Sequence, residues 1–452
     1  MTIHDYLELE KQLPQLDDIE VNCLPVWRIV RTKFRWSMIN GRPFTVSKNY
    51  QLGVQLRNNH RSFMGLTKLM LSKRRVKTIF FPHPRLFLVD GRYVERMSDP
   101  LIDYSEIKDN YLILERHQNG LHKEPRIHSE HVVFLDFIDN TSRIVKPFLK
   151  ILNKRKYEKA VNKLISILEK EYQFNSGRIR GVFIDTLSFF FAQKALTAPI
   201  LRHLAPRQVF VAPRQTYQHV IANCKGLGIR SIELQHGVTV GETELYSGSY
   251  DDRIDPDFFC VFGKANVGPQ FGMPVDRVIN IGFSYKNYVK SLGLKKFGSQ
   301  VILVISEPEI STKVVDLLIS FVDYHPDFIF HIRCHPQERF SAELMERLRN
   351  YERIKVVDNT LESFCALSKY ECVIGENSTV MYEAMSMGKK VGRLNYGGFR
   401  VKETDLIHGG TKINSHDELI EFVNSPYSDE QDSKDVYSDF DKQSLYSILN
   451  LI

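Results

Sequence analysis

Residues 371–395, ECVIGENSTVMYEAMSMGKKVGRLN, decide the fold. Residues 372–375 predict a short buried strand, residues 380–387 carry apolar side chains at helical spacing, and residues 391–394 begin another strand. This βαβ unit of a parallel sheet puts a polar turn at a helix N-terminus, beside the carboxyl end of a strand. Free backbone N–H groups and the helix dipole attract a phosphate or a carboxylate there. The turn contains Glu376, Asn377, Ser378 and Thr379.

Two interpretations of this turn remain open. Its side chains could cap a structural helix, or the helix start could bind an anion. None of Asn377, Ser378 and Thr379 is followed three residues later by Glu or Gln, so no capping box competes for the free donors. Glu383 lies one turn beyond Thr379 on the same helix face, where it could accept hydrogen bonds from a ribose.

Length and composition limit the class of protein. A chain of 452 residues is too long for one compact core, so we expect two domains of about 200 residues. With 43% hydrophobic and 25% charged residues, the composition is that of a soluble globular protein. No apolar run approaches the roughly 20 residues that a membrane span needs, and the polar N-terminus lacks a signal-peptide pattern. Six scattered cysteines without a C-x-x-C pair indicate buried thiols in a reducing cytoplasm.

The positive charge is concentrated near the N-terminus. Between Val21 and Val89 there is no Asp or Glu, but there are fourteen Lys and Arg residues. Aromatic residues such as Trp27, Phe34 and Phe63 are interspersed with them, which suits an amphipathic surface on anionic lipid, where each cation contributes about 1 kcal/mol. A solvated basic face of a helical subdomain is the alternative. No recognised motif supports nucleic-acid binding.

We therefore expect residues 21–89 to contact an anionic membrane surface, and we expect no nucleic-acid partner. The run Lys73-Arg74-Arg75 is the densest part of this basic stretch. The expected location is cytoplasmic and peripheral, at the inner face of the cell membrane.

Short β-rich runs alternate with helical segments in two blocks, which is typical of Rossmann-like domains. We expect strands in the first block at 78–81, 111–114, 131–137, 208–211, 231–234, 258–262 and 278–281. We expect strands in the second block at 301–305, 328–333, 354–357, 372–375 and 391–394. Long helices are expected at 147–172 and 181–196.

The sequence thus predicts an α/β fold in which two Rossmann-like domains with parallel sheets face a central cleft. The expected divisions are a basic helical N-terminal region packed on the first domain, a first Rossmann-like domain, a second Rossmann-like domain, and an acidic loop with a closing helix. Their bounds are 1–75, 76–285, 286–425 and 426–452, respectively.

The strand ends of the second block carry candidate donor-site residues. Arg333 and His335 point to the same face of their strand, because side chains alternate with a period of two. Pro336 fixes the turn after His335, and a cation beside an imidazole suits a phosphate. The alternative is a structural His-Pro turn. Ser306 and Glu307 end the first strand of this block, where a base or ribose is often bound.

A second histidine lies at a strand end of the first block. His236 stands between Gln235 and a glycine, and Glu242 and Glu244 follow shortly afterwards. His236 or one of these carboxylates could take the proton from an attacking hydroxyl, provided that it lies within hydrogen-bond reach. A structural histidine is the alternative.

Weaker acceptor-site candidates are polar residues near other strand ends: His83, Asp136, Arg214 and Gln235. Several enzyme classes lack support. There is no G-x-S-x-G elbow, no G-x-x-x-x-G-K-[ST] loop and no G-x-G-x-x-G fingerprint. The pair Asp255 and Asp257 precedes a strand, whereas a metal-held diphosphate would need it at a carboxyl end. We expect no metal site and no cofactor.

Three motifs in order resemble bacterial GT-B glycosyltransferases of surface-polysaccharide (capsule and O-antigen) synthesis. They are Gln235-His236-Gly237, Arg333-Cys-His335-Pro336, and Glu376-Asn-Ser378-Thr379 with Glu383. Similar families are the capsule-synthesis Kdo transferases, the sialyltransferases with a His-Pro motif, and the teichoic-acid glycerophosphotransferases. UDP-N-acetylglucosamine 2-epimerase has a comparable C-terminal half. The resemblance covers roughly residues 205–400.

The resemblance implies that His335 and the Ser378-Thr379 turn bind the phosphate of the donor nucleotide, and that Glu383 holds its ribose. The acidic motif that carries the general base of the sialyltransferases has no clean copy here. Gln235-His236-Gly237 stands near its position.

The expected activity is metal-independent transfer (the EC 2.4 class) of a sugar from a nucleotide-activated donor, with CMP or CDP slightly ahead of UDP. The expected acceptor is a glycan or a lipid-linked glycan of the bacterial surface. The alternatives are a CDP-polyol phosphotransferase of the teichoic-acid type and a non-catalytic scaffold of polysaccharide assembly.

Overall fold

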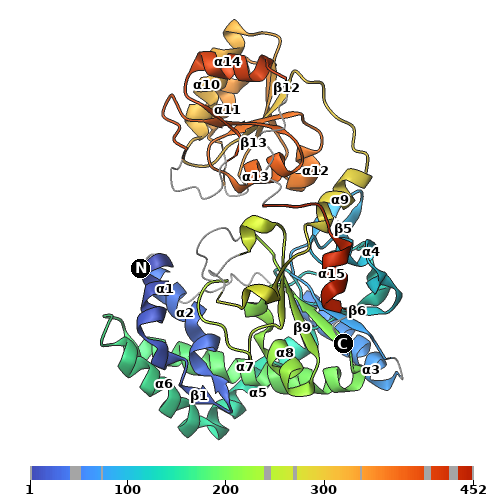
Figure 1. Ribbon diagram of the computed structural model, residues 1–452, viewed down its shortest axis with the longest axis vertical. Coiled ribbons are helices and arrows are strands. Elements are labelled where there is room, and N and C mark those ends of the chain that lie inside the picture. The colour runs from blue at the N-terminus through green and yellow to red at the C-terminus, as the bar shows by residue number, and fades with distance from the viewer. Residues whose placement is uncertain are drawn as a thin grey trace.

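The computed structural model describes residues 3–40, 52–72, 75–238, 246–267, 272–335, 338, 340–401, 409–426 and 436–449. Its two halves each contain a parallel sheet, one below and one above the middle of the molecule (Figure 1). The α/β fold predicted from the sequence, with two Rossmann-like halves that each contain a parallel sheet, is confirmed.

The first sheet has seven strands in the order β11-β10-β9-β8-β3-β6-β7, and every neighbouring pair is parallel. Its strands are β3 Thr78–Phe81, β6 Tyr111–Glu115, β7 Val132–Phe134, β8 Gln208–Val211, β9 Arg230–Leu234, β10 Phe258–Val261 and β11 Val278–Asn280. Four helices, α3, α5, α7 and α8, cover one face, and α4 and α15 cover the other.

The second sheet has six parallel strands in the order β14-β13-β12-β15-β16-β17. They are β12 Val301–Ile305, β13 Ile329–Arg333, β14 Ile354–Val357, β15 Cys372–Gly375, β16 Lys390–Leu394 and β17 Thr411–Ile413. In β12, Leu303 faces the helices α9, α12 and α13, whereas Val304 faces α10, α11 and α14. Because both faces of the sheet are covered, its central strands are continuous apolar runs.

The helices between these strands complete the two layers. They are α1 Ile3–Gln12, α2 Val26–Asn40, α3 Leu52–Leu71, α4 Asp99–Asp103, α5 Asp136–Leu152, α6 Lys154–Leu168, α7 Ser176–Leu204, α8 Arg214–Leu227, α9 Ser284–Ser291, α10 Ser311–Tyr324, α11 Ala342–Leu348, α12 Ser363–Leu367, α13 Thr379–Ser386, α14 His416–Asn424 and α15 Lys442–Leu449. Two antiparallel pairs stand apart from the main sheets: β1 Glu20–Val21 with β2 Leu24–Pro25, and β4 Phe87–Val89 with β5 Arg92–Val94.

Two sequence predictions in the first half were wrong. The strand expected at 131–137 ends at Phe134, and Asp136 begins helix α5, with Asp139 also in the first turn. Acids there are favoured by the positive end of the helix dipole. The single helix expected at 147–172 is two helices, α5 and α6, which meet at Asn153.

The N-terminal helices are part of the core, contrary to the expected lipid contact of their aromatic residues. Trp27 and Phe34 of α2 are buried against α6 and α7. Arg31 forms a two-pronged ion pair with Glu10, with distances of 2.6 and 2.5 Å. Arg28 pairs with buried Asp255 at 2.9 Å. These side chains are therefore unavailable to a membrane, because each already has an intramolecular partner.

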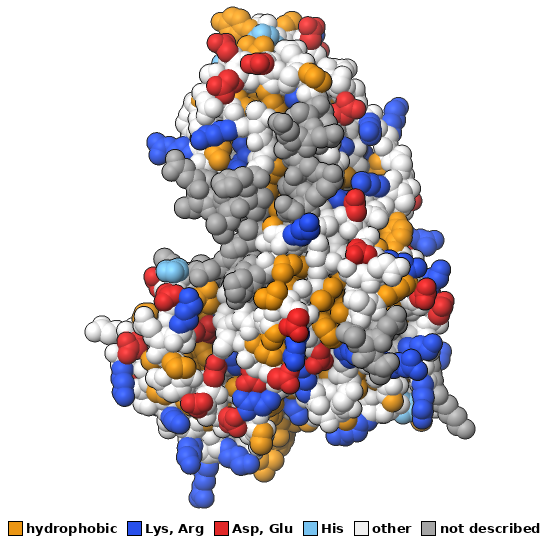
Figure 2. Space-filling model, viewed as in Figure 1, with side chains coloured by type: hydrophobic (Ala, Val, Ile, Leu, Met, Phe, Trp, Pro, Cys, Tyr) orange, Lys and Arg blue, Asp and Glu red, His pale blue; other side chains and the backbone are white. Residues whose placement is uncertain are grey.

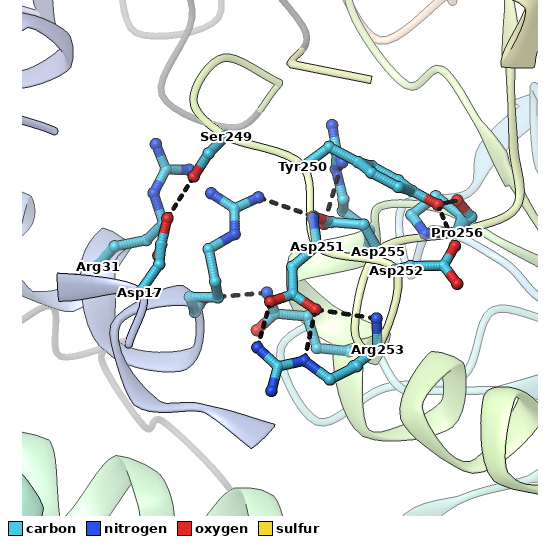
Figure 3. A network of polar contacts seen from close by, with 12 residues as sticks. Asp17, Arg31, Ser249, Tyr250, Asp251, Asp252, Arg253, Asp255 and Pro256 are labelled. Carbon is cyan, nitrogen blue, oxygen red and sulfur yellow. Dashed lines mark hydrogen bonds and ion pairs between the residues drawn. The ribbon is translucent and has the colours of Figure 1, made fainter. Parts of the chain in front are cut away.

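Figure 3 shows how this region is fastened to the segment before β10. The Ser249 hydroxyl donates to Asp17 at 2.6 Å. Asp251 accepts two bonds from the Arg253 guanidinium, and its own N–H donates to Asp255 at 2.9 Å. The N-terminal residues and this loop thus share one polar network.

The C-terminal segment returns to the first domain. The backbone N–H of Ser438 donates to the carbonyl of Phe262 at 2.7 Å, and Leu445 of α15 is buried against the first sheet. Figure 1 shows α15 beside β6 and α4, far from the second sheet that precedes it in the chain. Tyr437 packs with Phe283 and with Phe364 of α12, so this segment stiffens the junction of the two halves. No helix in the described ranges has the length and apolar composition of a membrane span.

Candidate functional site

A cleft of about 740 Å³ lies between the two sheets, within the range of ligand sites. Its upper wall follows the carboxyl ends of β12, β13, β14 and β15, and its lower wall is formed by loops of the first domain. The strand order reverses between β12 and β15, which is where open parallel sheets bind ligands. The lower wall contains Arg85, Leu86, Phe87, Arg96 and Gln118.

Two arginines, one on each wall, are the candidates in the cleft for binding an anion; four glutamates, Glu307, Glu309, Glu362 and Glu383, also line it. Arg85 comes from the loop after β3, and Arg333 ends β13, so one cation stands on each wall. Among the described residues, neither guanidinium has a carboxylate within ion-pair distance: Arg85 lies over the Phe87 ring, and Arg333 donates to the carbonyl of Leu361 at 2.6 Å. Burial lowers the pKa of both side chains, with Arg96 adding to the effect at Arg85. An anionic ligand would supply the missing counter-charge.

The loop after β13 presents His335 to the same cleft. Its ring is exposed, and Glu338 organises its backbone by accepting from the His335 N–H at 2.9 Å. The second oxygen of Glu338 accepts from the Ser306 hydroxyl at 2.7 Å. Ser306 is fully buried and supports the His335 loop through its bond to Glu338. Glu307 lines the cleft. Pro336 lies outside the described residues.

Helix α13 begins in the cleft. Ser378 is its N-cap residue and makes no capping hydrogen bond with its side chain, so the first backbone N–H groups of the helix stay available. Asn377 and Thr379 also line the cleft. Glu376 does not line it; it accepts from the backbone N–H of Arg400 at 2.5 Å and thereby fixes the turn.

A buried ion-pair cluster closes the back of the cleft. Arg96 of the first domain donates to Glu383 of α13 at 3.1 Å and lies 3.3 Å from Glu362, the N-cap residue of α12. Burial opposes the charge of Arg96, but the two carboxylates outweigh it and raise its pKa above the usual range. Burial also raises the pKa of Glu383, and Arg96 counteracts that rise. The cluster joins both halves of the chain through a single guanidinium.

Glu383 keeps one acceptor for a ligand. Its Oε1 binds Arg96, whereas its buried Oε2 makes no hydrogen bond of good geometry with the described residues, although the nearby Ser363 hydroxyl helps to lower the pKa of Glu383. Because a buried acceptor left unpaired costs about 1–3 kcal/mol, a ribose hydroxyl donated to this atom would be strongly favoured. Glu383 lines the cleft, as that contact requires.

Aromatic rings surround Arg96. Its guanidinium lies between 5.1 and 5.7 Å from the ring centroids of Phe87, Phe283, Tyr285 and Phe364. Each contact is a cation–π interaction, and Arg96 is mostly but not fully buried at the edge of the cleft. The rings belong to both halves of the chain, so Arg96 is held in one orientation.

On the acceptor side, two histidines stack at the carboxyl ends of β3 and β9. The rings of His83 and His236 are 5.4 Å apart and nearly parallel. Burial lowers the pKa of each to about 4, with the neighbouring ring and Arg85 adding to the effect at His83. His83 Nδ1 accepts from the Arg85 N–H at 3.1 Å, and His236 Nδ1 is bonded to the Tyr246 hydroxyl. Both rings are therefore neutral at pH 7.

This pair makes stability depend on pH in a defined window. Between pH 6.5 and about 4 the unfolded chain takes up protons that the folded histidines exclude, so the free energy of unfolding falls as the pH falls. We expect the melting temperature, measured by circular dichroism, to drop more steeply from pH 7 to 5 in the wild type than in His83→Gln. If the melting temperatures of the two proteins fell equally with pH, His83 and His236 would not be a neutral buried pair.

The other acceptor candidates lie away from the cleft and have buried partners. Asp136 bonds to His122 at 2.7 Å, Arg214 forms ion pairs with Glu233 and Asp255, and Gln235 donates to Asn266 at 2.8 Å. Like His83 and His236, these three candidates do not line the cleft, and because each already has a buried ion-pair or hydrogen-bond partner, none of the three enters the proposal below. Glu242 and Glu244 lie outside the described residues.

Sequence reasoning missed Arg85, Arg96, Glu338 and Glu362. Arg85 carried a signal, since it follows His83 in a loop at a strand end. Glu338 also carried one, because it stands three residues after His335, at the spacing of a closed turn. Arg96 and Glu362 carried none, because their roles depend on each other across the fold.

No family model matches the chain, and no curated protein matches it. Among solved structures it is similar to UDP-GlcNAc 2-epimerase from Methanocaldococcus jannaschii, at 10% identity and a TM-score of 0.47, covering 83% of this chain and 99% of that one. It is also similar to Anabaena Alr3699/HepE in complex with UDP and glucose, at 13% identity and a TM-score of 0.41, covering 83% and 100%. TarM is similar at 14% identity and a TM-score of 0.34, covering 57% and 58%. At these values the cleft residues themselves must carry the functional argument.

Proposed function

We propose that this protein is a metal-independent glycosyltransferase that moves a sugar from a nucleotide-activated donor to a bacterial surface glycan. One observation carries the proposal. Arg85 and Arg333, both without a carboxylate partner in the described ranges, share a cleft with His335 and the unused helix start at Ser378. This set suits a phosphate group, because cations and free backbone donors converge on one volume.

The donor nucleotide occupies the upper wall in this proposal. Its phosphate lies between Arg333, His335 and the N-terminus of α13, and its ribose donates to Oε2 of Glu383. The nucleotide is CMP, CDP or UDP. The leaving phosphate gains negative charge as the glycosidic bond breaks, and prepositioned donors stabilise that charge more than they stabilise the ground state. Arg85 completes the anion site from the opposite wall.

The acceptor approaches from the first domain. His83 and His236 follow β3 and β9, which lie on either side of β8 in its sheet, and both are neutral at pH 7. We assign His236 to positioning or activating the acceptor hydroxyl, because a neutral imidazole can both donate and accept a hydrogen bond. The acceptor is a glycan or lipid-linked glycan at the cytoplasmic face of the membrane.

Nucleotide binding tests the proposal without knowledge of the sugar. A ligand that binds only the folded state increases the free energy of unfolding and so raises the melting temperature. At a ligand concentration one hundred times the dissociation constant, the gain is about 2.7 kcal/mol. We expect at least one of CMP, CDP and UDP to raise it in the presence of EDTA, and Arg333→Met to remove most of the shift. The absence of a shift with every nucleotide, or a shift that EDTA removes, would contradict the proposal.

A further inference from the structure

An apolar stripe runs along the exposed side of α5. Ile144, Phe148, Ile151 and Leu152 recur at helical spacing and are between 64% and 79% exposed. A scattered exposed apolar residue is ordinary, but four on one helix face form a patch. Figure 1 shows α5 at the lower end of the molecule, and Figure 2 shows hydrophobic side chains protruding there.

Helix α3 extends the patch. Asn140 of α5 donates to Asn59 at 3.2 Å, and the Phe63 and Phe137 rings are 5.1 Å apart, so the two helices pack antiparallel. The antiparallel arrangement directs the Leu52 end of α3 toward the part of α5 that carries Ile144 and Phe148. Leu52 and Leu56 are 71% and 62% exposed. The apolar residues of both helices therefore flank one seam.

Positive charge surrounds this seam. From Thr141 to Tyr157 the chain contains six Lys and Arg residues and no Asp or Glu. Arg155 and Lys156, at the start of α6, are exposed and directly follow the apolar end of α5. Lys146 and Lys150 both pair with Asp185 of α7, whereas α3 contributes Arg57 and no acid. Figure 2 shows Lys and Arg side chains beside the lower hydrophobic cluster.

We propose that the seam of α3 and α5, with the basic start of α6, binds the surface of an anionic lipid bilayer. Phe148, Ile151 and Leu152 enter the headgroup boundary, while Arg155 and Lys156 contact lipid phosphates. A second copy of the chain fits less well, because symmetric pairing would bring the two basic rims together. The proposed lipid-facing surface shares α3 with the stretch 21–89, whereas the α2 part of that stretch is buried.

Only the biological role of lipid binding, which is to keep the enzyme near a lipid-linked acceptor, rests on the proposed function. Lipid binding itself needs no substrate, so it can be measured alone. Thermal-shift binding of nucleotide in the same preparations reads the catalytic cleft separately. Loss of one with retention of the other therefore shows which of the two proposals fails.

The test is flotation of the full chain with vesicles of phosphatidylglycerol and phosphatidylcholine, compared with phosphatidylcholine alone. We expect binding to the anionic vesicles only, weakened by salt. The double variant Phe148→Ser, Ile151→Ser should lower the partition coefficient about tenfold or more, because each apolar side chain would lose its burial in lipid. Arg155→Gln with Lys156→Gln should lower it severalfold.

Matched controls keep the result specific. Tyr324, which is 78% exposed on α10, gives an apolar control as Tyr324→Ser, and Lys295→Gln with Lys296→Gln gives a charge control. Both should bind as the wild type does. Equal binding of the wild type and the α5 variant overturns the proposal, and so does an absence of binding by the wild type. A dimer in sedimentation that Phe148→Ser disrupts would assign the surface to a second copy and also overturn it.

Discussion

The variant His335→Ala is expected to lower kcat/KM for sugar transfer by about 10²–10³-fold, the usual effect of removing one donor aimed at developing charge. The melting temperature should change little, because the His335 ring is exposed and its backbone bond to Glu338 does not need the side chain. Transfer kinetics with a saturating acceptor, together with a thermal melt, measure both quantities.

Ser378→Ala provides an independent probe of the same phosphate. An N-cap serine usually costs about 1 kcal/mol when replaced, because its side chain caps the helix. Ser378 makes no such bond, so the alanine variant should keep nearly all its stability while its affinity for nucleotide falls. If the variant instead lost stability and kept its affinity, the hydroxyl would be a structural cap.

A matched histidine separates these effects from general damage. His416 lies in the same domain, with its ring 5.3 Å from that of Phe321 and outside the cleft. His416→Ala should retain the transfer rate of the wild type. Rates of His335→Ala within about twofold of those of His416→Ala would remove His335 from the leaving-group site.

Much of the second domain could be predicted because its strands are defined locally. Each of β12, β14 and β15 is a short apolar run that ends at a polar or glycine residue, and their observed bounds match the expected ones. A parallel sheet brings the carboxyl ends of its strands to one edge, so His335 and Ser378 could be expected to lie near each other. The structure places both in one cleft.

The α2 part of the basic N-terminal stretch was misinterpreted because composition does not reveal pairing. Arg28 and Asp255 are 227 residues apart in sequence, and nothing near either residue indicates the other. The absence of local acids between Val21 and Val89 therefore suggested free charge, although the partners of Arg28 and Arg31 lie outside that stretch. The exposed apolar stripe of α5 could not be predicted from the sequence either, because which face of α5 is exposed depends on how the helix packs against α7.

Arg96→Met is expected to destabilise the protein by about 3–5 kcal/mol, because it leaves Glu362 and Glu383 buried without their cation. Methionine keeps most of the apolar volume among the four rings, so lost packing contributes little. Urea unfolding followed by circular dichroism measures the change. Arg96→Lys should lie in between, since a lysine keeps the charge but cannot reach both carboxylates with a planar fork.

Neutralising the two acids separates the structural role of this cluster from its role in binding. In the triple variant Arg96→Met, Glu362→Gln, Glu383→Gln no buried charge remains, so most of the lost stability should return. Nucleotide affinity should not return, because an amide at position 383 is a weaker acceptor for ribose than a carboxylate. Recovery of affinity together with stability would show that Glu383 serves only as the partner of Arg96. Its unpaired Oε2 in the cleft leads us to expect the opposite.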